Sequence, residues 1–120
     1  MFEFNKNEPL WQQIILDIQT KIASGYYTTG TQIESVRELA SIYGVNPNTI
    51  VKSLSVLEDK GILKTERGIG KFVDMDEAAI EEMKIELASR LIQNVVKQCK
   101  AMGVDQILFD AIAKKEYMHE

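Results

Sequence analysis

The chain has 120 residues, 45% of them hydrophobic and 27% charged, a composition that can build a core and excludes an intrinsically disordered chain. A single cysteine, Cys99, excludes an internal disulfide framework, and no apolar run approaches the ~20 residues of a membrane-spanning helix. The net charge of −4 argues against a simple polybasic nucleic-acid binder, but residues 1–73 are neutral and the acidic excess lies in residues 74–120. The N-terminus has no basic region followed by an apolar one, so we expect a cytoplasmic protein without a signal peptide.

The N-terminal part is predicted to be a short arm followed by a helix. Residues 1–8 are interpreted as the arm, and Pro9 is placed to open the helix. The apolar residues that recur at helical spacing are Leu10, Ile14, Ile18 and Ile22. We expect this helix to end at residues 24–25 and a short strand to form at residues 32–33.

A helix, a tight turn and a second helix are predicted next. Ser35 precedes Glu38 by three residues, which is the spacing of a capping box at a helix start. Gly44 ends that helix. Asn46 is then the expected N-cap of the second helix, with Pro47 at its first position.

The following segment has the pattern of a glycine-tipped hairpin. The second helix is expected to end near residues 60–61, and strand-like runs at residues 62–65 and 71–73 flank the sequence RGIG at 67–70. Helix, turn, helix and hairpin in this order predict a winged helix-turn-helix, a mostly α fold of the α+β type. Such a module lays its second helix in the major groove of DNA.

The C-terminal part is predicted to be two helices separated at Gly103, with residues 74–102 in the first and about 105–115 in the second. Two apolar rows run along the longer helix. The first row comprises Ile80, Met83, Leu87, Leu91 and Val95, and the second comprises Ile85, Ala88, Ile92, Val96 and Cys99. Both rows could form core alone, but two rows are more than one contact face needs, so one can pack within the chain and the first row is the predicted interface of a homodimer. We therefore divide the chain into a winged domain, residues 1–75, and a helical dimerisation region, residues 76–120.

Five strings resemble the GntR family of bacterial transcription regulators. They are PLWQQI (9–14), SVRELA (35–40), GVNPNTI (44–50), LEDKGIL (57–63) and RGIGKFV (67–73). The short tail resembles the small YtrA-type subfamily, in which it is a two-helix dimerisation unit. The chain departs from the general family at Glu34, where proline is frequent, and at Pro47, where arginine is frequent but proline is usual in the YtrA type. The resemblance implies a homodimeric regulator, more often a repressor, that binds an inverted-repeat operator in double-stranded DNA.

Candidate DNA-binding residues come from three places. Asn48, Thr49, Lys52 and Ser53 are interpreted as lying opposite the apolar stripe of the second helix, where they would read bases, or else form a solvated polar face. Arg37 would contact the DNA backbone, or pair with Glu34, Glu38 or Glu58. The wing candidates are Arg67, Gly68, Gly70 and Lys71, which would otherwise form an ordinary hairpin turn, and Asn46 is foremost a cap that could also face a phosphate.

The sequence predicts no enzyme. His119 is the only histidine and lies at the chain end, so no Ser-His-Asp or Cys-His arrangement, no metal site and no cofactor site is expected. Two alternatives to a plain DNA-binding regulator stay open. One is a sensor with an unknown small-molecule effector at the dimer seam, and the other is a winged-helix module that binds only protein.

Overall fold

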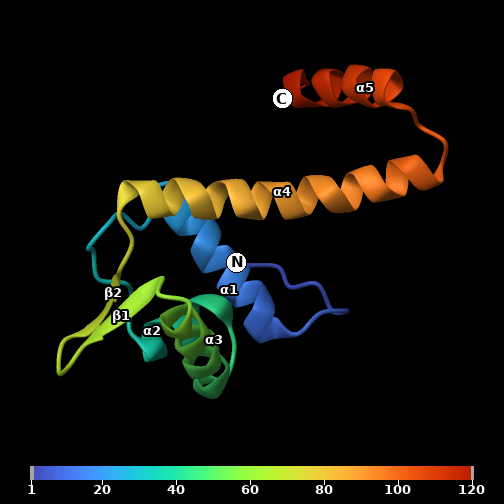
Figure 1. The fold of residues 1–120 in the computed structure, drawn as a ribbon. Helices are drawn as coiled ribbons and strands as arrows, with labels where there is room; N and C mark the ends of the chain where they lie inside the picture. The colour runs from blue at the N-terminus through green and yellow to red at the C-terminus, as the bar shows by residue number, and fades with distance from the viewer. Residues whose placement is uncertain (1, 120) are drawn as a thin grey trace. The chain divides into compact units, whose positions relative to one another are not determined.

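The computed structural model describes residues 2–119, which follow the order of a winged helix-turn-helix with a helical tail (Figure 1). The elements are α1 (Leu10–Ala23), α2 (Val36–Tyr43), α3 (Pro47–Asp59), β1 (Leu63–Glu66), β2 (Gly70–Val73), α4 (Glu77–Ala101) and α5 (Gln106–Met118). The predicted fold class is confirmed. No helix within the described residues is long and apolar enough to cross a membrane.

The contacts of the chain divide it into two compact units, the first ending at Met83 and the second beginning at Lys84. Helix α4 therefore starts in the first unit and ends in the second. The functional division at residues 75 and 76, with dimerisation assigned to the part after it, stays a prediction.

The core of the first unit lies among α1, α2, α3 and the hairpin. Helices α1 and α2 both pack against α3, which also packs against β1. The side chains with almost no exposed surface are Ile14, Ile18, Ile22, Leu39, Ile50, Leu54, Leu57, Leu63 and Val73. Burying one large aliphatic side chain contributes about 1.5–3 kcal/mol, so this shared core fixes the orientation of α3.

Helices α2 and α3 begin and end at the caps that the sequence predicts. The Ser35 hydroxyl accepts from the backbone N–H of Glu38 at 3.2 Å, and the Glu38 carboxylate accepts from the N–H of Ser35 at 3.0 Å. These bonds to its charged form hold the pKa of Glu38 below its ordinary value. Gly44 ends α2 at a left-handed φ of 67°, and the Asn46 side chain starts α3 by accepting from the N–H of Asn48 at 2.8 Å.

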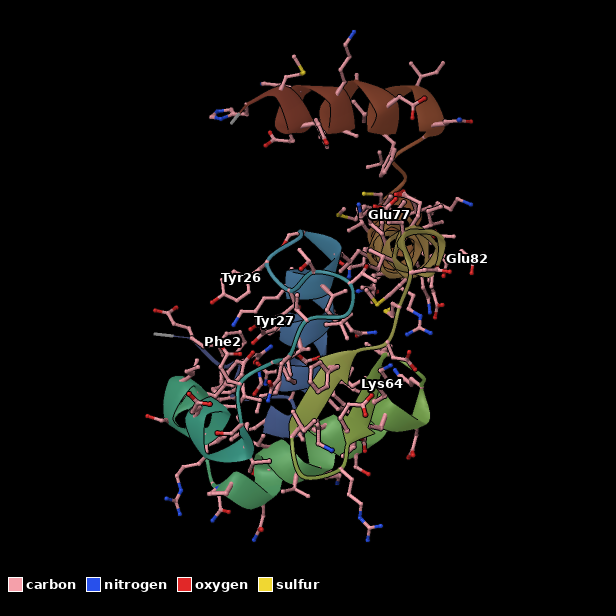
Figure 2. All side chains as sticks on the ribbon, turned by 90° about the vertical axis from the view of Figure 1, so that its left-hand side faces the viewer. Phe2, Tyr26, Tyr27, Lys64, Glu77 and Glu82 are labelled. Atoms are coloured by element: carbon pink, nitrogen blue, oxygen red, sulfur yellow. The ribbon has the colours of Figure 1, made fainter. Side chains whose placement is uncertain are left out.

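Two tyrosine hydroxyls donate to carboxylates, one linking α2 to α1 and the other lying within the loop after α1. The Tyr43 hydroxyl donates to Asp17 at 2.5 Å, and Lys21 lies 3.3 Å from the same carboxylate. The hydroxyl of Tyr27, which lies in the loop after α1 and is labelled in Figure 2, donates to Glu34 at 2.5 Å. Burial raises the pKa of both tyrosines, so both hydroxyls are held as donors at neutral pH.

The hairpin is antiparallel and carries a third, very short partner. Leu63 pairs with Val73 and Glu66 with Gly70, and an isolated bridge joins Gln32 to Phe72. The N–H of Ile33 also donates to the carbonyl of Lys71 at 2.9 Å. In place of the predicted strand at residues 32–33, the structure has only this single bridge at Gln32, which anchors the base of the hairpin to the loop before α2.

The N-terminal arm is docked on the first unit. Phe2 contacts the rings of Phe4 and Tyr43 edge-on, with its ring centroid 4.6 and 5.3 Å from theirs. The side chain of Gln13 then pairs with the backbone of Asn5, accepting and donating at 2.7 Å. The arm therefore covers the face of the domain formed by α1 and the end of α2.

The second unit buries little of its apolar surface. Gly103 separates its helices at a φ of 81°, and Asp105 caps α5 by accepting from the N–H of Leu108 at 2.9 Å. Among the described residues from Lys84 onward, no side chain is fully buried. Its large exposed apolar residues are Ile85, Leu91, Ile92, Val95, Met102, Ile107, Leu108, Ile112, Tyr117 and Met118.

Candidate nucleic-acid interface

Helix α3 has one buried and one exposed face. Ile50, Ser53, Leu54 and Leu57 form the buried face, each with at most 1% of its surface exposed. The exposed residues Asn48, Val51, Lys52 and Ser55 are spaced i, i+3, i+4 and i+7. That spacing puts them on a single outward stripe, which we call the α3 stripe. The stripe starts at the capped N-terminal turn of the helix.

Ser53 is not part of this stripe, and the prediction that it contacts DNA is wrong. Its side chain is completely buried, and its hydroxyl oxygen lies 2.9 Å from the carbonyl oxygen of Trp11 and 3.1 Å from that of Thr49. The reason is its spacing: it follows the buried Ile50 by three residues and therefore shares its face. Ser53 joins α1 to α3 inside the domain.

The other predicted residues at the start of α3 occupy different environments. Asn48 is exposed, whereas Thr49 is half-buried, and Asn46 uses its side-chain oxygen as the N-cap. Lys52 is exposed, and its ammonium group lies 4.3 Å from the centre of the Trp11 ring. A cation over an aromatic face is held electrostatically, so the lysine side chain leans toward α1.

Arg37 lies on α2 with an exposed side chain and has no hydrogen-bond or ion-pair partner among residues 2–119. The three carboxylates considered as partners are engaged elsewhere. Glu34 accepts from a tyrosine hydroxyl, Glu38 closes the cap of α2, and Glu58 pairs with a lysine of the wing. The guanidinium is therefore free to contact a phosphate.

The tip of the wing is a tight turn, in which the N–H of Ile69 donates to the carbonyl of Glu66 at 2.9 Å. Gly68 has a φ of 78° and Gly70 a φ of 149°, both in the region that disfavours side chains. Arg67 stands in this turn, exposed and without a partner among the described residues. The wing thus presents one free cation on a backbone of fixed shape.

Sequence reasoning missed the residue that holds this turn. Gln32 donates from its side-chain nitrogen to the carbonyl of Ile69 at 3.0 Å. A Cβ on Gly70 would lie 2.4 Å from that nitrogen, so glycine is needed for space as well as for its φ. The strand propensity of residues 32–33 places Gln32 near the wing, but nothing in the sequence aims its side chain at the turn.

Lys71 was predicted to be a free wing cation, and the structure gives it internal partners. Its Nζ lies 2.9 Å from a Glu58 oxygen and donates to the Thr65 hydroxyl at 2.8 Å, while Thr65 itself donates to Glu58. These bonds from Thr65 and Lys71 lower the pKa of Glu58. Lys71 therefore fastens β2 to α3.

The predicted dimer row of α4 divides between the two compact units. Met83 has only 8% of its surface exposed and groups with the first unit, so its assignment to an interface between chains is wrong. Ile80 and Leu87 are partly exposed, and Leu91 and Val95 are 67% and 49% exposed. Helical periodicity alone could not show that Met83 is already buried within one chain.

Sequence comparison shows what the chain is similar to. The sequence model of the bacterial regulatory proteins of the gntR family matches residues 10–73. The HTH-type transcriptional regulator YhcF of Bacillus subtilis is 33% identical, over 85% of this chain and 84% of its own length. The HTH-type transcriptional repressor YtrA of Bacillus subtilis is also 33% identical, over 81% of this chain and 70% of its own length.

Solved structures agree with the sequence comparison. A GntR family transcriptional regulator from Listeria monocytogenes superimposes with a TM-score of 0.89 at 35% identity, over 93% of this chain and 98% of that one. The DNA-binding domain of AraR in complex with operator ORX1 superimposes with a TM-score of 0.55 at 28% identity, over 61% of this chain and 92% of that one.

Proposed function

This chain belongs to the gntR family of bacterial regulatory proteins and is a DNA-binding transcription regulator, and we propose that it acts as a homodimeric repressor on an inverted-repeat operator. Its relatives are regulators and not enzymes. The observation that carries the proposal is the α3 stripe, whose polar members start at a capped helix end and are left exposed by the domain. The N-terminal part of a recognition helix is what enters a major groove.

The residues divide into those that read bases and those that position the protein. Asn48 pairs with an adenine edge, Thr49 contacts an adjacent base, and Lys52 reaches a guanine or a phosphate. Arg37 and Arg67 bind phosphates on either side of the groove, and their lack of internal partners supports this role.

The wing backbone at Gly68 and Gly70 approaches the adjacent minor groove or the phosphate backbone. We revise the role of Lys71 from phosphate contact to wing alignment, because its ammonium is occupied by Glu58 and Thr65. Asn46 serves as the cap that orients the base-reading turn.

Dimerisation is proposed for the second unit. Its exposed apolar residues would leave a large unfavourable surface in a lone chain, and a second copy of the same helices supplies a matching apolar face. Leu87, Leu91 and Val95 are the proposed centre of this interface, with Ile80 at its edge. A dimer also places two copies of α3 on two half-sites, as an inverted repeat requires.

Repression, a cytoplasmic location and binding of a small-molecule effector at the dimer seam belong to the same proposal. Repression is supported by the relative YtrA, which is a transcriptional repressor, and the cytoplasm is where the DNA of a bacterial regulator lies. An effector would be detected as a ligand that raises the melting temperature of the purified protein.

Selection from a random duplex pool at ~100 mM salt tests the proposal. We expect an inverted repeat to be enriched, with its half-site spacing set by the dimer. A variant with Arg37 and Arg67 both changed to alanine should enrich nothing, whereas the matched variant Lys60→Ala, at the far end of α3, should enrich the same repeat. Absence of any enriched sequence with the folded wild-type protein would support the protein-interaction alternative instead.

A further inference from the structure

Two members of the α3 stripe, Val51 and Ser55, have no role in base reading so far, and Val51 is the apolar one. Val51 is 52% exposed and lies between Asn48 and Lys52 on the outward face. The core does not need it there, because the buried face of α3 is complete without it. Valine is also a poorer helix former than alanine, since its branched Cβ restricts the side chain.

The surroundings of Val51 leave it uncovered at the centre of the stripe. Lys52 leans onto Trp11 of α1, with 4.3 Å from its Nζ to the ring centre, and the flanking stripe residues Asn48 and Ser55 are short. A single exposed valine elsewhere on a surface would be unremarkable. In the proposed complex with DNA, however, this face of α3 lies against the floor of the major groove, and Val51 meets the bases there.

The major groove offers one apolar group among its donors and acceptors, the 5-methyl group of thymine. Valine presents two methyl groups from a single stiff rotamer, so it matches such a group in size and needs no reordering. Val51 follows Asn48 by three residues, a rise of about 4.5 Å along the helix, which is close to the ~3.4 Å between stacked bases.

We propose that Val51 is a specificity-determining residue that packs against the 5-methyl group of a thymine, about one base pair from the base that Asn48 contacts. The inference rests on the proposed function, because it names the base chemistry that the same helix recognises. It assigns to this chain a preference for T over C and over unmethylated uracil at one position of each half-site.

Replacement of thymine by uracil in the selected operator tests the contact, because uracil pairs in the same way and lacks only the methyl group. Each thymine position of the half-site is replaced in both half-sites at once, and affinity is measured by fluorescence anisotropy. Loss of one buried methyl per half-site is expected to weaken binding about 4-fold, and about 15-fold for the two half-sites together. The loss should occur at one position only.

The variant Val51→Ala should bind the thymine operator more weakly and should lose the discrimination, with equal affinity for the thymine and uracil duplexes. Ser55→Ala, four residues further along the same stripe, is the matched control and should retain the wild-type ratio of affinities for the two duplexes. Because Val51 is outside the core, its alanine variant should unfold at or above the wild-type temperature.

Two results separate the failure of this inference from the failure of the proposed function. If wild-type protein binds the operator but is insensitive to uracil at every position, or if Val51→Ala keeps the discrimination, the thymine contact is wrong while DNA reading by α3 stands. If the wild-type protein binds no duplex in preference to random DNA, the proposed function fails and this inference fails with it.

Discussion

Substitution of Gly70 by alanine tests how the wing acquires its shape. At a φ of 149° a side chain is strained, which costs about 1–3 kcal/mol. The new Cβ would also lie 2.4 Å from the side-chain nitrogen of Gln32. That nitrogen can move away, but it then gives up its hydrogen bond to the Ile69 carbonyl, which contributes about 1 kcal/mol. We therefore expect Gly70→Ala to lower the free energy of unfolding by about 2–4 kcal/mol.

The chain offers matched controls for each part of this cost. Gly68 has a φ of 78° but nothing within 4 Å of an added Cβ, so Gly68→Ala should cost only the backbone part, about 1–2 kcal/mol. Gln32→Ala removes the hydrogen bond alone. In the Gln32→Ala background, Gly70→Ala should cost about 1 kcal/mol less than in the wild type, because that bond is already absent.

Urea unfolding, followed by circular dichroism at constant pH, gives the free energy of unfolding of the four variants and the wild type, and hence the coupling between positions 32 and 70. Strictly additive effects of Gln32→Ala and Gly70→Ala would refute the idea that the Gln32 side chain and the Gly70 backbone share one space. Equal costs for the two glycine substitutions would lead to the same conclusion.

Three further outcomes are expected. If Arg37, Lys52 and Arg67 of each chain contact phosphates, the logarithm of the operator affinity should fall with the logarithm of salt concentration at a slope of about −5. Arg37→Ala and Arg67→Ala should each make that slope shallower by about 2. An unchanged slope in operator titrations of either variant would contradict its phosphate contact. Thr65 and Lys71 lower the pKa of Glu58, so the stabilisation by this carboxylate is present above its unfolded pKa and is lost as pH falls through its folded pKa. Glu58→Gln should therefore reduce the fall in the free energy of unfolding at acid pH. The same fall in both proteins would show that Glu58 does not contribute to it. Leu91→Asp should give a monomer in analytical ultracentrifugation. Gln93→Glu adds the same negative charge at a position outside the two apolar rows and should remain a dimer. If both variants are dimers, Leu91 is not in the dimer interface.

Local signals in the sequence were enough for the helix-turn-helix. The Ser35 capping box and the Asn46 cap act within four residues, so their meaning does not depend on the rest of the fold. The wing was predictable for a similar reason, since Gly68 and Gly70 permit backbone conformations that few other residues adopt. These elements carry most of the candidate site.

What sequence reasoning missed depends on contacts between distant segments. Ser53 shares the buried face of Ile50 by its spacing, but only the fold brings the Trp11 carbonyl, 42 positions away, to its hydroxyl. Lys71 is charged like the free wing arginine, and only the fold brings Glu58 next to it. The arm was expected to be a simple extension, but aromatic packing of Phe2 and Phe4 on Tyr43 holds it on the domain.

The most direct test of base reading by α3 is duplex selection with Asn48→Ala beside the wild-type protein under identical conditions. Asn48 is exposed at the first turn of α3 and can pair with an adenine through both of that base's major-groove groups. We predict the same inverted repeat and half-site spacing for both proteins, with the preference relaxed at a single adenine of each half-site in the variant. An identical motif at every position in both selections would contradict base reading by Asn48 at the first turn of α3.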